Sequence, residues 1–159
     1  MRDNRTMTTT SRRGFLYGLA ATGLSVAVLP FGSLRAAAKG DLAAEAMKAV
    51  LGDAKPTAGR VTVELPEIAE NGNTVPCTVK VDSPMTAADH VKQVTVFATG
   101  NPTPNVCTLN FTPESGKAEA AIRIRLGKTQ DIVVIAQMSD GKFYSGKKNV
   151  KVTIGGCGG

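Results

Sequence analysis

The sequence contains few aromatic and few metal-binding side chains. Tryptophan is absent, histidine occurs once, at His90, and only 4% of the 159 residues are aromatic. Single-stranded nucleic acids are usually bound by aromatic side chains beside a basic surface, so we expect no nucleic-acid partner. A structural zinc site needs four Cys or His ligands. Three cysteines without a Cys-x-x-Cys pair do not form a recognisable set, so we expect no metal.

Residue combinations typical of catalysis are also missing. No Cys–His or Ser–His–Asp set can be assembled around the single histidine, and the carboxylates are scattered singly among lysines. No phosphate-binding loop of the G-x-x-x-x-G-K type occurs. The sequence therefore predicts no catalytic residue and no bound cofactor.

The first 38 residues have the composition of an export signal. Arg12 and Arg13 precede a mostly apolar stretch at residues 15–29, and a small-residue cleavage site follows at residues 36–38. This order is typical of a secretory signal, and paired arginines ahead of it indicate the twin-arginine route. An uncleaved membrane anchor is the alternative, but the apolar stretch is short for a span. We predict that residues 1–38 are removed and that the domain is periplasmic, without membrane association after cleavage.

One helical pattern follows the signal. Asp41 can cap a helix, apolar residues follow at i, i+3 and i+4 spacing, and Gly52 can end it. The predicted apolar stripe consists of Leu42, Ala43, Ala46, Met47 and Val50.

Beyond Pro56 the hydrophobic pattern changes to period two. Seven segments have the character of strands: residues 60–65, 74–82, 90–98, 105–111, 120–126, 131–138 and 150–154. Turn-forming clusters separate them, and Asp140-Gly141 predicts a tight hairpin. Short strands at this spacing are typical of an immunoglobulin-like antiparallel β-sandwich. We therefore predict an all-β fold of about seven strands, preceded by a short helix, over residues 39–154.

Two of the three cysteines lie within predicted strands. Cys77 and Cys107 are in phase with inward-facing apolar neighbours. An oxidising compartment would allow a structural disulfide between them. The alternative is two separate buried thiols that act as small apolar side chains. We favour the disulfide and assign neither cysteine a functional role.

The third cysteine, Cys157, lies in the terminal sequence Gly-Gly-Cys-Gly-Gly. An odd cysteine in an exported protein indicates intermolecular pairing or a reactive thiol. Glycines offer no side chain to shield it, and five residues extend about 16–18 Å at ~3.3–3.6 Å each. We therefore predict that residues 155–159 form a flexible arm that presents the thiol. Its glycines are Gly155, Gly156, Gly158 and Gly159.

The arm hypothesis has two consequences. Valine in place of Gly156 or Gly158 should leave folding intact but slow any partner that must accept the arm. Nothing adjacent in the sequence would activate the thiol of Cys157, which suits a carrier better than a catalyst.

Taken together, these features resemble the SoxY family, the sulfur-carrier subunits of the periplasmic thiosulfate-oxidising (Sox) multienzyme system. The resemblance covers essentially the whole chain, including "NGNTVP", "DSPMTAADHVK", "FTPESGKAEAAIRIRL" and "SDGK". It is most specific in the terminal "GGCGG" preceded by "KVTI". The resemblance implies that Cys157 covalently holds thiosulfate-derived intermediates while thiosulfate is oxidised to sulfate, and that the chain is a protein substrate rather than an enzyme.

The resemblance also implies partners. A haem-containing sulfur transferase would couple thiosulfate to Cys157, a hydrolase would release sulfate, and a sulfane dehydrogenase would oxidise the remaining sulfur. A SoxZ-like subunit would form a heterodimer with the carrier.

Two other interpretations remain open at this point. The chain could be an exported structural or binding module whose terminal cysteine forms an intermolecular disulfide. A thiol oxidoreductase is less well supported, because the sequence lacks a Cys-x-x-Cys pair.

Overall fold

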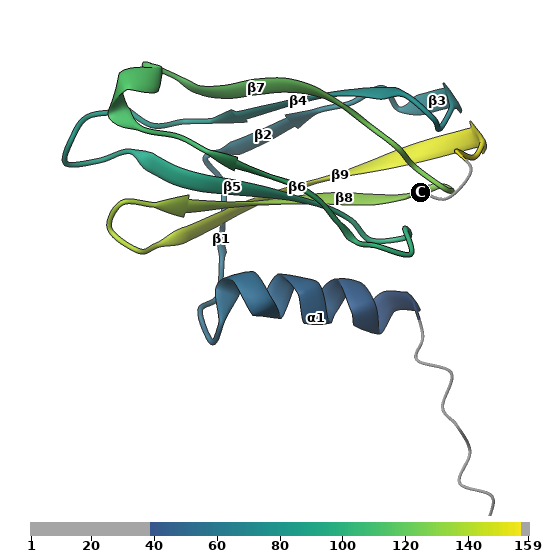
Figure 1. Cartoon of the computed structure of the whole chain (residues 1–159), viewed down its shortest axis with the longest axis horizontal. Coiled ribbons are helices and arrows are strands. Elements are labelled where there is room, and N and C mark those ends of the chain that lie inside the picture. The colour runs from purple at the N-terminus through teal and green to yellow at the C-terminus, as the bar shows by residue number, and fades with distance from the viewer. Residues whose placement is uncertain (1–38, 157–159) are drawn as a thin grey trace, which may run out of the picture. The chain divides into compact units, whose positions relative to one another are not determined.

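The computed structural model describes residues 39–156, all within the compact unit Arg35–Gly159 (Figure 1). The predicted export signal at residues 1–38, with Arg12 and Arg13, lies outside the described residues, as do Cys157, Gly158 and Gly159. The described elements are α1 (Lys39–Leu51), β1 (Thr57–Ala58), β2 (Val61–Glu64), β3 (Ile68–Asn71), β4 (Val75–Val81), β5 (Val91–Ala98), β6 (Asn105–Asn110), the short 3-10 helix η2 (Pro113–Ser115), β7 (Ala118–Ile124), β8 (Gln130–Met138) and β9 (Phe143–Ile154).

Two sheets pack face to face and enclose the core (Figure 1). One sheet has the strand order β1-β9-β8-β5-β6, with β3 also paired to β9, and the other has the order β2-β4-β7. Alternate residues point inward, as expected for half-buried strands; on β4, Val75, Val79 and Val81 are all buried. The core is built almost entirely from Val, Ile, Leu and Ala. The predicted β-sandwich is confirmed.

The strands differ from the prediction in number and in direction. All seven predicted strands are present, and the Asp140-Gly141 turn joins β8 to β9 as a hairpin. Strands β1 and β3 are additional, and both pair with β9 in parallel. They contain two and four residues, which is too short for a period-two pattern to be visible. The sheet is therefore not purely antiparallel.

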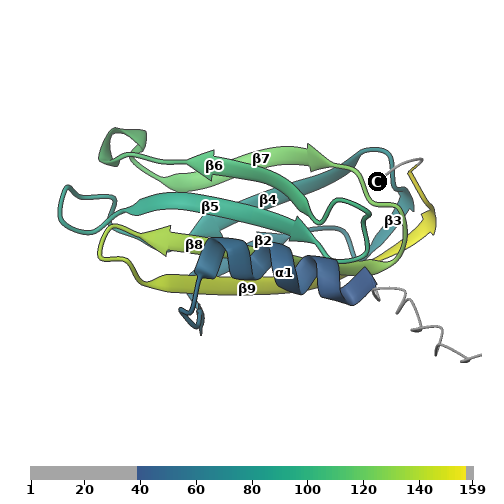
Figure 2. The same cartoon turned by 60° about the horizontal axis from the view of Figure 1, so that its bottom comes forward.

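Helix α1 lies on the outer face of the larger sheet (Figure 2). It ends where predicted: Gly52 has a φ of +61°, and its N–H donates to the Lys48 carbonyl at 2.8 Å, a left-handed C-terminal cap. Ala43 on the helix is 2% exposed, and Phe97 of β5, which lies outside the inter-sheet core, is 0% exposed. The helix thus covers its own sandwich through a second, smaller apolar contact.

The apolar stripe of the helix is narrower than predicted. Leu42 is 40% exposed, whereas the small side chain of Ala43 is buried, which lets the helix approach the sheet closely. Helix α1 is too short and too polar to cross a membrane, and no other helix in residues 39–156 qualifies.

Candidate functional site at the root of the C-terminal tail

Two glycines separate the last strand from Cys157 in the sequence. Strand β9 ends at Ile154, and Gly155 and Gly156, which we call the tail root, follow it. The contacts of the tail root therefore fix the backbone that directly precedes Cys157 in the sequence. This makes the surroundings of Gly156 the candidate site.

Three backbone hydrogen bonds fix the tail root to two neighbouring loops. The N–H of Gly72 donates to the Ile154 carbonyl at 2.7 Å, that of Leu126 to the Gly72 carbonyl at 2.8 Å, and that of Gly156 to the Leu126 carbonyl at 2.9 Å. We call this set the backbone junction. Leu126 is 0% exposed, so the junction is anchored in the hydrophobic core.

The glycines of the junction are required by close packing. A Cβ added to Gly155 would overlap the carbonyl oxygen of Gly127, and one added to Gly72 would overlap that of Leu126. A Cβ on Gly156 would lie 2.9 Å from both the Gly72 oxygen and the Arg125 Cγ. Because these distances are below those of real Cβ contacts, backbone or side chains would have to shift.

The free arm at residues 155–159 stays a prediction, and in the structure its first two glycines, Gly155 and Gly156, pack closely against the neighbouring loops. Glycine permits both flexibility and close backbone approach, and at these two positions the structure uses the second property. This packing leads us to expect that valine at 156 destabilises the fold, in contrast to the expectation from the sequence.

A buried polar pair supports the loop that receives the tail root. Asn101 is 4% exposed and Gln130 is 5% exposed. The Asn101 side chain donates to the Arg125 carbonyl at 2.8 Å and accepts from the Gly127 N–H at 3.1 Å. The Gln130 amide donates to the Asn101 side-chain oxygen at 2.8 Å. Sequence analysis missed both residues, because Asn101 lies in a Gly-Asn-Pro sequence that indicates only a turn.

The other two cysteines are free thiols, so the favoured disulfide is not formed. Cys77 lies on β4 of one sheet and Cys107 on β6 of the other. The structure therefore supports the alternative interpretation, in which two separate thiols pack as small apolar side chains.

Both thiols are protonated at neutral pH. Burial raises the pKa of Cys77 to about 11, and the nearby Cys107 raises it further as a potential like charge. Burial also raises the pKa of Cys107. Because the thiolate is the reactive form, neither residue competes with an accessible cysteine for sulfur chemistry.

The raised pKa of Cys77 predicts an alkaline loss of stability. The folded state holds the Cys77 proton more tightly than the unfolded state, so its stabilising effect is complete below about pH 9 and is lost as the pH rises to about 11. We expect Cys77→Val to reduce this decline by roughly 1–3 kcal/mol relative to wild type. Urea unfolding at pH 7 and pH 10.5 measures it, and equal declines in the two proteins would contradict the assignment.

The single histidine has structural contacts. The Nδ1 atom of His90 lies 3.1 Å from the Thr86 carbonyl, and its backbone N–H donates to the Ser139 hydroxyl at 3.2 Å. Residues 39–156 contain no group of three or more Cys, His, Asp or Glu side chains that could hold a metal ion.

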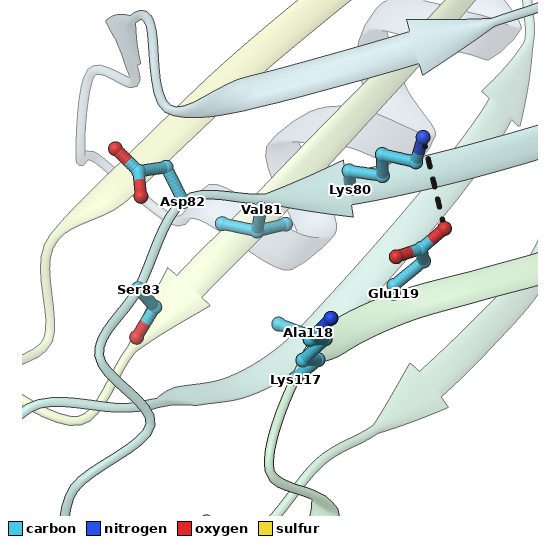
Figure 3. A pocket seen from close by; sticks show the side chains of 7 residues that line it. All are labelled: Lys80, Val81, Asp82, Ser83, Lys117, Ala118 and Glu119. Atoms are coloured by element: carbon cyan, nitrogen blue, oxygen red, sulfur yellow. Dashed lines mark ion pairs between the residues drawn. The ribbon is translucent and has the colours of Figure 1, made fainter.

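A pocket of about 140 Å³ lies at the end of strands β4 and β7 where Val81 pairs with Ala118 (Figure 3). Its lining comprises Lys80, Val81, Asp82, Ser83, Lys117, Ala118 and Glu119. The Lys80 ammonium is 2.8 Å from Glu64 and 3.7 Å from Glu119, so its charge is already paired. Strands β4 and β7 run from this end, at Val81 and Ala118, to Val75 and Ile124 near the junction, about 20 Å at ~3.3 Å per residue. The pocket is therefore separate from the candidate site.

Solved structures with a similar fold include a sulfur carrier and superoxide reductases. The sulfur carrier protein SoxY from Chlorobium limicola f thiosulfatophilum is 32% identical, with a TM-score of 0.60, over 72% of this chain and 98% of that one. The superoxide reductase (neelaredoxin) of Ignicoccus hospitalis is 18% identical, with a TM-score of 0.53, over 59% and 80% of the two chains. That of Nanoarchaeum equitans is 12% identical, with a TM-score of 0.51, over 60% and 100%. The reductases share the fold alone.

No curated protein is significantly similar to this chain. The fold and the tail define a small β-sandwich protein with a cysteine just beyond its last strand. The model of the family described as sulfur oxidation protein SoxY matches residues 47–157. The chain belongs to the SoxY family. Together with the Chlorobium structure, this membership indicates a sulfur carrier in sulfur oxidation, a carrier subunit rather than a catalyst.

Proposed function

We propose that this protein holds thiosulfate-derived sulfur covalently on Cys157 while thiosulfate is oxidised to sulfate. The observation that carries the proposal is the backbone junction, which fixes the chain through Gly156 at one end of the sandwich, directly before the cysteine. The family match extends through residue 157 and so includes that cysteine. The two other cysteines are buried or half-buried with raised pKa values, which leaves Cys157 as the candidate nucleophile.

The proposed chemistry needs two partners for its first two steps. In the first step the Cys157 sulfur and the outer sulfur of thiosulfate form an S–S bond, the thiol proton is released, and two electrons pass to a haem-containing sulfur transferase. In the second, a hydrolase adds water at the sulfonate sulfur; the S–S bond to that sulfur breaks, sulfate leaves, and a persulfide remains on Cys157. A sulfane dehydrogenase would then oxidise the persulfide sulfur with further water as the oxygen source.

The remaining parts of the proposal concern assembly and location. A SoxZ-like subunit would form a heterodimer with this chain, and Arg12 and Arg13 would direct its export by the twin-arginine pathway to the periplasm. The domain itself would need no cofactor, because the electrons and the water are handled by its partners.

Intact mass spectrometry separates the carrier from the alternative module that crosslinks through its terminal cysteine. The protein is isolated under non-reducing conditions from cells grown on thiosulfate. We expect monomer masses that include thiosulfonate or sulfane adducts, all removed by reductant. A population dominated by Cys157–Cys157 dimers without adducts would support the crosslinking module instead.

A basic side chain next to the tail root should favour anionic sulfur compounds. Arg125 is exposed, and its Cγ packs beside Gly156, the residue that precedes Cys157 in the sequence. We expect Arg125→Gln to slow the reaction of Cys157 with tetrathionate, a dianion, by about two- to fivefold through lost electrostatic attraction, and Arg125→Lys to preserve it. The reaction with neutral iodoacetamide is the comparison, and equal slowing of both reagents would refute an electrostatic role.

A further inference from the structure

The loops at the tail end of the sandwich are connected through one buried amide. Asn101 comes from the loop between β5 and β6, and its side chain bonds the backbone on both sides of Leu126. Its own position is fixed by Gln130, which also donates to the Lys128 carbonyl at 3.0 Å and accepts from the Gly100 N–H at 2.7 Å. The side-chain amides of both residues are hydrogen-bonded, so the network specifies a single loop conformation.

The segment held by Asn101 is the one that holds the tail root. The Leu126 carbonyl accepts from the Gly156 N–H at 2.9 Å, and the Gly127 carbonyl oxygen is the atom that Gly155 packs against. The Gly127 N–H that Asn101 binds belongs to the same peptide group as the Leu126 carbonyl, and the Arg125 carbonyl that it binds belongs to the same peptide group as the Leu126 N–H.

We propose that Asn101, supported by Gln130, is a positioning residue for the carrier thiol. By fixing the tail root, it sets the departure point of the cysteine-bearing segment at Gly156 and leaves Cys157 one Cα–Cα step, about 3.8 Å, beyond fixed backbone. The backbone that precedes the thiol is thus presented to a partner enzyme at a defined place beside the loops around Gly72 and Leu126. Residues 155 and 156 need not be ordered when the partner docks, which lowers the entropic penalty of docking. This inference rests on the proposed carrier function.

The first test measures anchoring and does not depend on sulfur chemistry. In the full mature protein, Asn101→Leu removes the side-chain hydrogen bonds to residues 125 and 127 at similar volume. We expect the amide hydrogen of Gly156 to exchange at least tenfold faster than in wild type, while that of Val134 in the core strand β8 changes much less.

The second test measures docking. Wild-type and Asn101→Leu carriers are loaded with tetrathionate to give the Cys157 thiosulfonate, and the sulfate-releasing hydrolase is assayed with each. We expect the hydrolase KM for the variant to rise several-fold with kcat changed less than twofold, because only the position of the thiol is altered.

Ser139→Ala is the matched control. Ser139 also joins two loops, accepting from the His90 N–H at 3.2 Å and donating to the Ala88 carbonyl at 3.1 Å, but it follows β8 at the opposite end from Gln130. We expect no selective change in Gly156 exchange and no change in KM. If Asn101→Leu does not fold, Gln130→Met replaces it with a smaller expected effect, because it leaves both hydrogen bonds from Asn101 to residues 125 and 127 in place while it removes those of Gln130 to Asn101, Lys128 and Gly100.

Gly156 exchange that rises no more in Asn101→Leu than in Ser139→Ala would overturn the anchoring role. Faster exchange with an unchanged KM would overturn the role in docking. A failure of the wild-type carrier to form any adduct on Cys157 would refute the proposed function and leave the exchange result valid, so the two failures are distinguishable.

Discussion

Replacing Cys157 with serine is expected to abolish sulfate formation from thiosulfate by the reconstituted system, to the level measured without the carrier. A serine hydroxyl cannot form the S–S bond that attaches thiosulfate, and the remaining thiols are buried or half-buried and protonated at neutral pH. The measurement is the rate of sulfate release with purified partner enzymes and each carrier variant in turn.

Cys107→Ser is the control for that experiment. Cys107 is only half-buried, so the substitution should be tolerated and sulfate formation should remain near the wild-type rate. Sulfate formation that persists with Cys157→Ser and disappears with Cys107→Ser would move the attachment site to the sandwich.

The second large effect is expected at Gly156. A valine there places Cβ 2.9 Å from the Gly72 carbonyl oxygen, and Gly72 cannot easily retreat because its N–H and carbonyl both belong to the backbone junction. We expect Gly156→Val to lower the free energy of unfolding by about 1–3 kcal/mol, the usual range for overpacking, and to slow partner turnover. Urea unfolding and the sulfate assay measure the two effects.

Gly158→Val distinguishes an effect of the valine on packing within the domain from an effect on access of the tail to partner enzymes. Position 158 lies beyond the backbone junction in sequence, so the sequence-based expectation still applies: unchanged stability with slower partner turnover. If Gly156→Val and Gly158→Val were equally stable, the packing role assigned to Gly156 would be wrong.

The sequence predicts the sandwich well because its main signal is local. In segments such as residues 74–82 and 120–126, apolar and polar residues alternate, and this pattern indicates directly which side chains face the core. Strands β4 and β7 form in these segments. Strand β3, with the sequence Ile-Ala-Glu-Asn, has only Ala69 buried. Its existence depends on its pairing with β9, which is a tertiary property.

The sequence alone identifies the position of the site but not the packing of the residues around it. The terminal Gly-Gly-Cys-Gly-Gly identifies Cys157, yet the same letters are compatible with free and with tightly packed glycine. Only the carbonyl groups of Gly72 and Gly127, distant in sequence, show that Gly155 and Gly156 are packed. The Cys77–Cys107 disulfide was wrong for a related reason: alternation of apolar and polar residues shows which side of a strand a cysteine lies on but not which side chains it meets in the core.

Pulse–chase labelling tests the central claim most directly. Whole cells receive a brief pulse of ³⁵S-thiosulfate followed by unlabelled thiosulfate, and trypsin releases residues 152–159 after Lys151, a peptide that contains Cys157 and no other cysteine. We predict that label appears on this peptide first and leaves it at least as fast as labelled sulfate forms. Label that never enters the peptide, or stays on it while sulfate accumulates, would contradict a covalent carrier role for Cys157.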